Sequence, residues 1–258
     1  IYARFWHKFL FDLGIVSRPE PFAELKNQGL ISGSDGRKMS KRWGNVINPD
    51  DVVASYGADT LRVYEMFMGP FEQGSSWSVD NLMGSRRFLE RVWRLAGKVS
   101  KEKDSSEIEA LLHKTIRQIS LDIERFSYNT SVSALMIMIN AWDKELNINS
   151  NNWKIFLKLL APFAPHLSEE LWANLGEKKS IHLSSWPKFD EGKLESQEVT
   201  LVVQINGKTR GTIKLTKDLD EDGIWDLIKK DSQFKSLISN SEPSRLILVP
   251  NRLINIVL

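Results

Sequence analysis

The chain has 258 residues, of which 41% are hydrophobic and 26% charged, and its formal net charge is only +2. This composition is typical of a globular protein, and with so little net charge any affinity for nucleic acid must come from local clusters of basic residues. Cysteine is absent, which excludes disulfides, thiol catalysis and cysteine-ligated zinc. The four histidines lack the spacing of metal ligands, so we expect no metal site. No apolar run approaches the roughly 20 residues of a membrane span, and we expect a cytoplasmic protein.

Residues 1–77 predict short helices joined by loops. Phe5, Phe9 and Leu13 recur at i, i+4 and i+8, which predicts a helix over residues 1–13. Residues 22–47 are loop-like, and Asn48-Pro49 then forms a helix start because Asn can cap and Pro suits the first helical position. That helix should stop near residue 57, and a second should cover 60–68. Because the chain begins with Ile inside a helical pattern, we expect it to be a piece of a longer protein.

Residues 78–189 have the pattern of a helical bundle. Ser78 can cap a long helix that reaches about residue 99, with an apolar stripe that includes Leu82, Val92 and Trp93. Three more amphipathic segments and a short helix over 166–175 follow. We expect these stripes to form the core and not a cofactor site.

From residue 190 the hydrophobic period changes from helical to alternating. Residues 190–198 are polar and linker-like, and residues 199–205 then alternate as a strand does. Asn206-Gly207 is a strong hairpin signal, with 208–215 as the return strand. A helix over 221–230 and strands over 245–249 and 253–258 complete a ββαββ module. The predicted fold class is therefore α with a small α+β domain.

A dense basic run occupies residues 37–42 between glycines. Lys38 and Lys41 are three apart with Ser40 between them. Two ammonium groups and a hydroxyl on a flexible loop suit a triphosphate, because phosphate contacts need charge and adaptability. On charge alone, a solvated basic loop is the simpler interpretation.

The surrounding sequence adds a resemblance to a known family. Residues 38–62, which begin Lys38-Met39-Ser40-Lys41-Arg42, resemble the KMSKS signature of class I aminoacyl-tRNA synthetases and the segment that follows it. Residues 3–10, 64–70 and 203–211 resemble the bacterial-type leucyl-tRNA synthetase family, and residues 160–172 resemble the helical bundle that this family shares with its valyl and isoleucyl relatives. The family's usual fifth signature residue is Ser, and here it is Arg42.

This resemblance implies a two-step ligase reaction. Leucine and ATP would form leucyl-adenylate, and the leucyl group would then pass to the terminal adenosine of the leucine tRNA. It implies that Lys41 contacts the ATP phosphates, that Lys38 supports them, and that Met39 and Ser40 shape the ATP site. Magnesium would arrive with ATP, with no metal site in this segment.

The resemblance also assigns parts of the enzyme to parts of the chain. Residues 1–77 correspond to the C-terminal end of the catalytic domain, 78–189 to a tRNA-binding, anticodon-binding-like bundle, and 190–258 to a C-terminal tRNA-binding domain. The family's upstream nucleotide-binding motif, leucine pocket and editing domain do not occur in this sequence. We therefore expect the chain alone to be inactive, either as a truncation or as the smaller subunit of a split enzyme.

Several basic residues are candidates for tRNA contact. Lys208 and Arg210 are two apart on one predicted strand and hence on one face, and Lys214 continues the row. The pair Arg87 and Arg91, at i and i+4, could line a phosphate track or make ordinary surface pairs, such as the one that Glu90 and Arg94 could form.

Two simpler alternatives remain open from the sequence. For His166, packing or capping at a helix start is simpler than a catalytic role. For the whole chain, a stand-alone tRNA-binding module with an inert signature loop is the alternative to an enzyme part.

Overall fold

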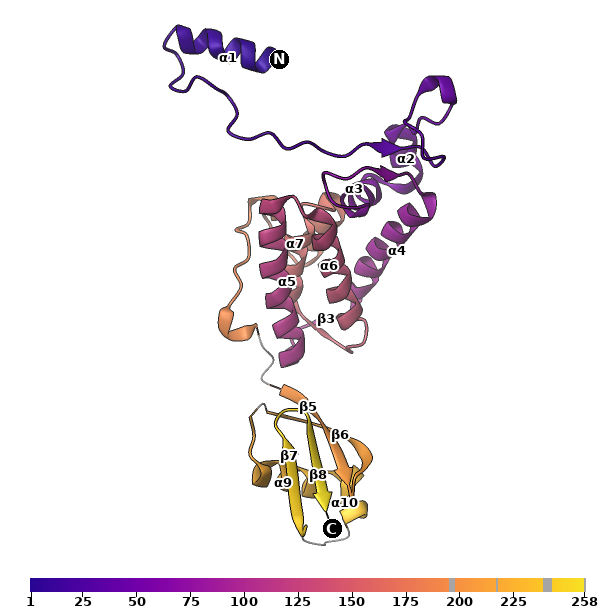
Figure 1. Cartoon of the computed structure of the whole chain (residues 1–258), viewed down its shortest axis with the longest axis vertical. Coiled ribbons are helices and arrows are strands. Elements are labelled where there is room, and N and C mark those ends of the chain that lie inside the picture. The colour runs from indigo at the N-terminus through magenta and orange to yellow at the C-terminus, as the bar shows by residue number, and fades with distance from the viewer. Residues whose placement is uncertain (195–197, 217, 239–242, 258) are drawn as a thin grey trace.

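The computed structural model of the protein describes residues 1–194, 198–216, 218–238 and 243–257. Helices predominate among these residues, with one four-stranded sheet near the C-terminus, which confirms the predicted fold class. The molecule is elongated: an N-terminal region leads into a helical bundle, and the sheet domain follows at the other end (Figure 1). None of the helices described is long and apolar enough to cross a membrane.

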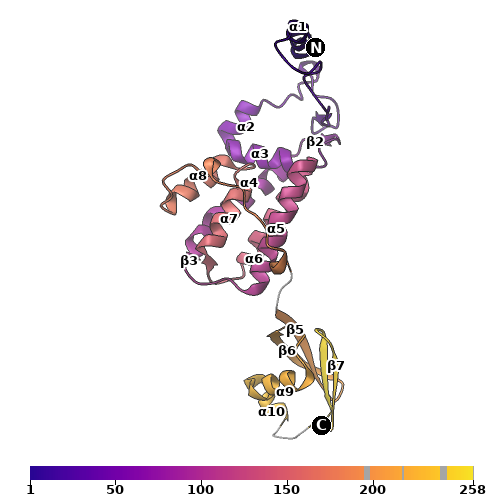
Figure 2. The same ribbon diagram turned by 90° about the vertical axis from the view of Figure 1, so that its left-hand side faces the viewer.

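The N-terminal region holds the predicted basic loop between short elements. Its helices are α1 (Tyr2–Asp12), α2 (Pro49–Tyr56) and α3 (Ala58–Phe67), and β1 (Ile31–Ser32) pairs in parallel with β2 (Ser75–Ser76). The Asn48 side chain caps α2 by accepting a hydrogen bond from the Asp50 backbone N–H at 3.2 Å, as predicted. Helix α1 lies at the end of an extended segment, apart from α2 and α3 (Figures 1 and 2), and its aromatic residues are exposed.

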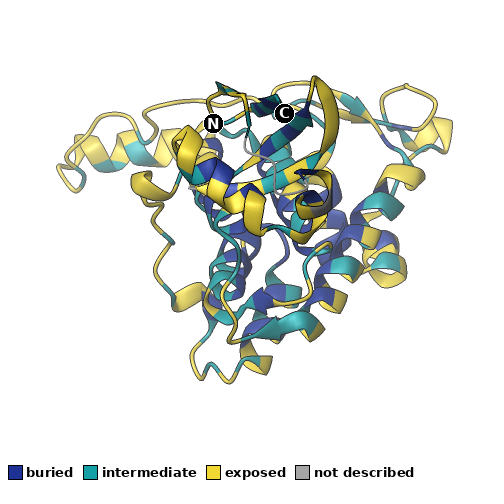
Figure 3. Ribbon diagram, turned by 90° about the horizontal axis from the view of Figure 1, so that it is seen from below, coloured by how far each residue is buried: buried dark blue, intermediate teal, exposed yellow. Residues whose placement is uncertain are grey.

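The bundle packs around one large apolar core. Its elements are α4 (Val79–Leu95), the 3-10 turn η2 (Ala96–Lys98), β3 (Val99–Ser100), α5 (Ser106–Arg125), α6 (Tyr128–Trp142), β4 (Ile148–Asn149), α7 (Ser150–Leu160), α8 (Pro165–Asn174) and the 3-10 turn η3 (Ile181–Leu183). Fully buried residues such as Leu135, Trp142 and Phe156 form its centre. Figure 3 shows the buried stretches of the ribbon in dark blue. Val63 of α3 belongs to the same core, so α3 packs directly on the bundle.

One residue of the predicted core stripe lies at the surface. Trp93 is 51% exposed, whereas Leu82 and Val92 on the same helix are fully buried. Trp93 directly follows Val92, about 100° further around the helix, which places it at the margin of the buried stripe. The expectation that Trp93 belongs to the core is therefore wrong.

The segment after η3 runs along α5. It includes the 3-10 turn η4 (Glu191–Lys193). Three polar contacts fasten it to α5. Trp186 Nε1 donates to Ser120 Oγ at 2.8 Å, the Asp190 backbone N–H donates to His113 Nδ1 at 2.9 Å, and Lys193 Nζ lies 3.6 Å from Glu109 Oε2. We call residues 186–193 the α5 strap.

The C-terminal domain is a four-stranded sheet with two helices on one face. Its elements are β5 (Glu198–Ile205), β6 (Lys208–Thr216), α9 (Glu221–Lys230), α10 (Ser232–Ile238), β7 (Arg245–Val249) and β8 (Leu253–Val257), in the sheet order β6-β5-β8-β7. Asn206 and Gly207 have φ of 48° and 75°, as the predicted tight hairpin requires. Helix α10 was not predicted, and its Phe234 is buried in the core with Leu201 and Ile254. The module is therefore ββααββ.

Candidate functional site

A single side chain, Asn45, closes the basic loop that joins β1 to α2. The Asn45 amide oxygen accepts a hydrogen bond from the Ser40 backbone N–H at 2.9 Å, and its nitrogen donates to Asp35 Oδ1 at 3.2 Å. Asp35 also accepts from the Arg37 backbone N–H at 3.1 Å. These hydrogen bonds, first that of Arg37 and then that of Asn45, hold the pKa of Asp35 below its ordinary value. We call residues 33–45, joined in this way, the signature loop.

The tight closure of the loop requires a glycine at its start. A Cβ on Gly33 would lie 2.8 Å from both Asn45 Nδ2 and Asp35 Oδ1, closer than real Cβ atoms come. The Gly33 backbone N–H donates to the Arg37 carbonyl at 2.8 Å, which closes the turn. A larger residue at position 33 would therefore push Asn45 out of its contacts.

Lys38 and Lys41 both project from this loop as free charges. Both residues are exposed, and neither side chain forms an ion pair or hydrogen bond with any residue that the structure describes. Ser40 caps the 3-10 turn η1 (Lys41–Trp43), and its Oγ accepts from the Arg42 backbone N–H at 3.3 Å. The two ammonium groups are available to an anion.

Met39 anchors the loop to the protein. It is partly buried against a small core that includes Val52, Leu61 and Trp77. The Met39 side chain therefore faces the protein, whereas Lys38 before it and Lys41 after it are exposed to solvent.

The predicted pair Arg87 and Arg91 on α4 is not one continuous cationic surface. Arg91 Nη2 lies 3.1 Å from Asp143 Oδ2, so its charge is paired. Arg87 is exposed and has no ion pair within the described ranges. Glu90 pairs with Arg86 at 2.9 Å and not with Arg94, which instead lies 3.6 Å from Asp143. Of the two candidates, Arg87 is the one with a free charge.

The predicted basic row on β6 is interrupted by a β-bulge. Gly211 pairs with Val203 and Thr209 pairs with Gln204, so Arg210 between them has no partner across the strands. An extra residue shifts the alternation by one, because side chains alternate with a period of two.

The bulge separates the three basic residues of the predicted row. Lys208 pairs with Ile205, a residue of the core face, whereas Lys214 pairs with Thr200 on the open face. The expectation that Lys208 and Lys214 lie in one row is therefore wrong. Lys214 is also engaged with Glu107 of α5 at 3.2 Å, whereas Lys208 and Arg210 are exposed at the end of the hairpin.

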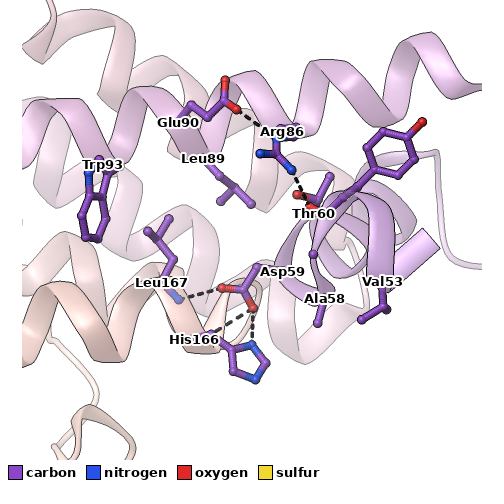
Figure 4. A pocket seen from close by; sticks show the side chains of 12 residues that line it. Val53, Ala58, Asp59, Thr60, Arg86, Leu89, Glu90, Trp93, His166 and Leu167 are labelled. Atoms are coloured by element: carbon purple, nitrogen blue, oxygen red, sulfur yellow. Dashed lines mark hydrogen bonds and ion pairs between the residues drawn. The ribbon is translucent and has the colours of Figure 1, made fainter. Parts of the chain in front are cut away.

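Sequence reasoning missed the junction between α3 and α8. The Asp59 carboxylate accepts hydrogen bonds from the Leu167 backbone N–H at 2.7 Å and from the His166 backbone N–H at 3.3 Å, and it lies 2.8 Å from His166 Nδ1 (Figure 4). Asp59 thus caps α8 from another helix. His166 takes part in this capping arrangement, as the simpler interpretation of that residue predicted. In the sequence, Asp59 is simply an acidic residue in the first turn of a helix, so nothing there points to its contact with α8.

A pocket of about 530 Å³ lies beside this junction. It is lined by Asp59, His166, Arg86, Glu90 and Trp93 among others, from α3, α4 and α8 (Figure 4). Its polar groups are largely satisfied by one another: Arg86 contacts Glu90 and donates to the Tyr56 carbonyl at 3.1 Å. Among the described residues, no three His, Asp or Glu side chains gather as a metal site would require.

Comparison with known proteins identifies the family. Residues 2–78 match the family model of tRNA synthetases class I (I, L, M and V), and residues 105–224 match the anticodon-binding domain of tRNA ligase. The second match runs from α5 into α9.

Two solved structures are similar to this chain. The first is a leucyl-tRNA synthetase (LeuRS) of Agrobacterium radiobacter K84, crystallised in a ternary complex with tRNA and LeuAMS. It is 34% identical with a TM-score of 0.69 over 99% of this chain and 36% of that one. The second is the methionyl-tRNA synthetase of Mycobacterium tuberculosis in complex with methionyl-adenylate. It is 16% identical over 70% of this chain and 47% of that one, and its TM-score of 0.47 is too low to support a conclusion.

These matches confirm the resemblance stated from the sequence. The chain spans about a third of the length of the leucyl enzyme that it matches. It belongs to the class I tRNA synthetases, it carries their anticodon-binding domain, and it is similar along its whole length to the corresponding part of a leucyl-tRNA synthetase.

Proposed function

We propose that this chain is the part of a leucine-tRNA ligase that supplies the ATP-binding signature loop and the tRNA-binding domains. The observation that carries the proposal is the pair of free ammonium groups, Lys38 and Lys41, on a loop held closed by Asn45. This loop lies inside the region that matches the class I family. The similarity to a LeuRS supports leucine as the amino acid.

The proposed first step is attack of the leucine carboxylate on the α-phosphorus of ATP. A bond forms from the carboxylate oxygen to phosphorus, the bond to the bridging oxygen breaks, and pyrophosphate leaves with an increased negative charge. Lys41 is assigned to the phosphates and Lys38 to their support, since positioned cations stabilise charge that develops on a leaving group. Ser40 and Met39 shape the same ATP site. Magnesium, bound to ATP as part of the substrate, would share the neutralisation of charge.

The second step brings tRNA to the same centre. The anticodon-binding match and the tRNA in the similar LeuRS complex support tRNA as the partner. We assign tRNA contact to Lys208 and Arg210 at the hairpin end and to Arg87 on α4, because these side chains are exposed and form no ion pair with the residues that the structure describes. Arg91 can contribute only if tRNA draws it from Asp143.

The proposal is tested by Lys41→Ala in the complete enzyme. We expect ATP-pyrophosphate exchange to slow by about 10²- to 10³-fold, the effect of removing one electrostatic stabiliser of a transition state. Leucine affinity, measured by equilibrium dialysis, should change far less. An unchanged exchange rate would overturn the assignment of Lys41.

A second experiment separates the enzyme part from a stand-alone tRNA-binding module. We propose that the chain alone forms no adenylate, and that it acts in the cytoplasm with the catalytic half of the enzyme. Mixing it with a separately produced N-terminal half should restore exchange. If mixing restores no exchange although both parts are folded, the binding-module interpretation is favoured.

A further inference from the structure

Two arginines of the signature loop converge on one exposed tryptophan. The Arg42 guanidinium carbon lies 5.1 Å from the centroid of the Trp43 ring, and that of Arg37 lies 5.3 Å from it. Trp43 is 53% exposed, so its ring is accessible from solvent. Arg42 stands where the signature usually has Ser. We call Arg37, Arg42 and Trp43 the arginine–tryptophan cluster.

The arrangement concentrates positive charge that the described residues do not neutralise by contact. Neither guanidinium has a salt bridge within the described part of the chain, and Lys38 and Lys41 add two further free charges to the same loop. Asp35 accepts hydrogen bonds from the Arg37 backbone N–H and from the Asn45 side chain, which lower the pKa of its carboxylate, and the charge of Arg37 lowers that pKa further. The Asp35 carboxylate nevertheless forms no ion pair with the Arg37 guanidinium. Both guanidinium carbons lie within 5.3 Å of the same ring centroid, so an anion bound beside the Trp43 ring would be attracted by both charges.

The chemistry of the cluster matches one unit of unpaired nucleic acid. A guanidinium binds a phosphate through two parallel hydrogen bonds. An exposed indole is a platform on which an unstacked base can lie, with arginine beside it. The two guanidiniums can therefore bind a phosphate while the Trp43 ring stacks on the base of the same nucleotide.

We propose that the arginine–tryptophan cluster binds a single-stranded nucleotide of RNA, next to the ATP site and separate from it. The inference rests on the proposed function, which assigns the ATP phosphates to Lys38 and Lys41. Those two lysines are assigned to the phosphates of ATP, whereas the cluster offers contacts for a second phosphate and for a base. A single RNA strand that ends near the reaction centre, as the unpaired end of a tRNA does, would supply that phosphate and base.

The test measures binding of a fluorescein-labelled, five-nucleotide single-stranded RNA to the 258-residue chain by fluorescence anisotropy. Trp43→Ala should weaken binding about tenfold, the effect of losing one stacked base, and Trp43→Phe should restore most of the affinity. Arg37→Ala with Arg42→Ala should lower the slope of log affinity against log salt by about 0.7, which corresponds to the one phosphate of the bound nucleotide on a single strand. The matched control is Trp93→Ala: Trp93 is 51% exposed, and no cation lies over its ring among the described residues. This variant should bind like the parent.

Parallel titration with ATP separates this inference from the proposed function. The ATP titration uses the complete enzyme: there Trp43→Ala should leave the dissociation constant for ATP within about twofold, whereas Lys38→Ala with Lys41→Ala should raise it. If the double lysine variant has the same dissociation constant for ATP as the parent, the assignment of the lysines to ATP is overturned, but the RNA result is unaffected. The RNA inference is overturned if the parent does not bind the oligonucleotide, if Trp43→Ala binds it like the parent, or if Trp43→Ala weakens only ATP. Circular dichroism of each variant verifies that the chain remains folded.

Discussion

The closure of the signature loop by Asn45 leads to a quantitative prediction. Asn45→Ala removes the hydrogen bond from the Ser40 N–H, at 2.9 Å, and the bond to Asp35, at 3.2 Å. At a net value of about 1 kcal/mol for each bond, the closed loop loses about 2 kcal/mol. Since about 1.4 kcal/mol corresponds to a factor of ten, kcat/KM for ATP in the exchange reaction should fall by up to about 30-fold in the complete enzyme. The KM for leucine should be unchanged, because Asn45 would act through the loop.

Two further variants show whether the contact with Asp35 carries part of this effect. Asn45→Asp retains the acceptor for the Ser40 N–H but loses the donor to Asp35, and Asp35→Ala removes the same contact from the other side. If the two residues act together, the double variant Asp35→Ala/Asn45→Ala costs less than the sum of the single changes. An exchange rate for Asn45→Ala within twofold of the parent would refute the role of Asn45, and so would an effect confined to leucine.

Two other predictions concern the RNA-binding end and the α5 strap. Lys208→Ala with Arg210→Ala should weaken tRNA binding and lower its salt slope by about 1.4 to 1.8. Lys214→Ala, whose charge is paired with Glu107, should have a smaller effect in the same filter-binding assay; equal slopes for all three proteins would contradict this assignment. For His113, burial is the main cause that lowers its pKa from 6.5, the charge of Lys193 lowers it further, and Asp190 and Glu109 oppose the shift. Unfolding therefore takes up a proton, and the free energy of unfolding should fall as the pH drops below about 6.5. His113→Gln should reduce this dependence in urea titrations, whereas parallel pH profiles would show that His113 does not contribute.

Most helices and strands could be predicted because their signals are local. Asn48-Pro49 marks the start of α2, and Asn206-Gly207 marks the hairpin, since both depend on backbone preferences of a few adjacent residues. The signature loop was also found from a continuous string, and Lys38 and Lys41 are exposed on that loop. Local patterns of this kind do not depend on which distant segments come together.

Three features that sequence reasoning missed depend on distant residues. The bulge at Arg210 shifts the alternation of β6, but nothing in the strand's own polar pattern marks the extra residue. The contact of Asp59 with α8 joins residues more than 100 positions apart. Trp93 has the spacing of a core residue, yet it lies at the rim of a pocket because α3 and α8 leave that side of α4 open. In each case the side chain's partner is decided by tertiary packing, which hydrophobic period alone does not determine.

The α5 strap shows how such packing can serve function. The polar composition of residues 190–198 predicted a linker-like segment, but the strap is fastened to α5 at Ser120, His113 and Glu109. Arg117 adds a cation over the Phe189 ring at 5.9 Å. These contacts hold residues 186–193 against α5, so the strap is packed as part of the bundle. Under the proposed function, a strap fixed in this way limits where the hairpin end can lie and so raises its effective concentration for an RNA that the bundle binds. The contacts along α5 would then contribute to tRNA affinity without any of them touching RNA.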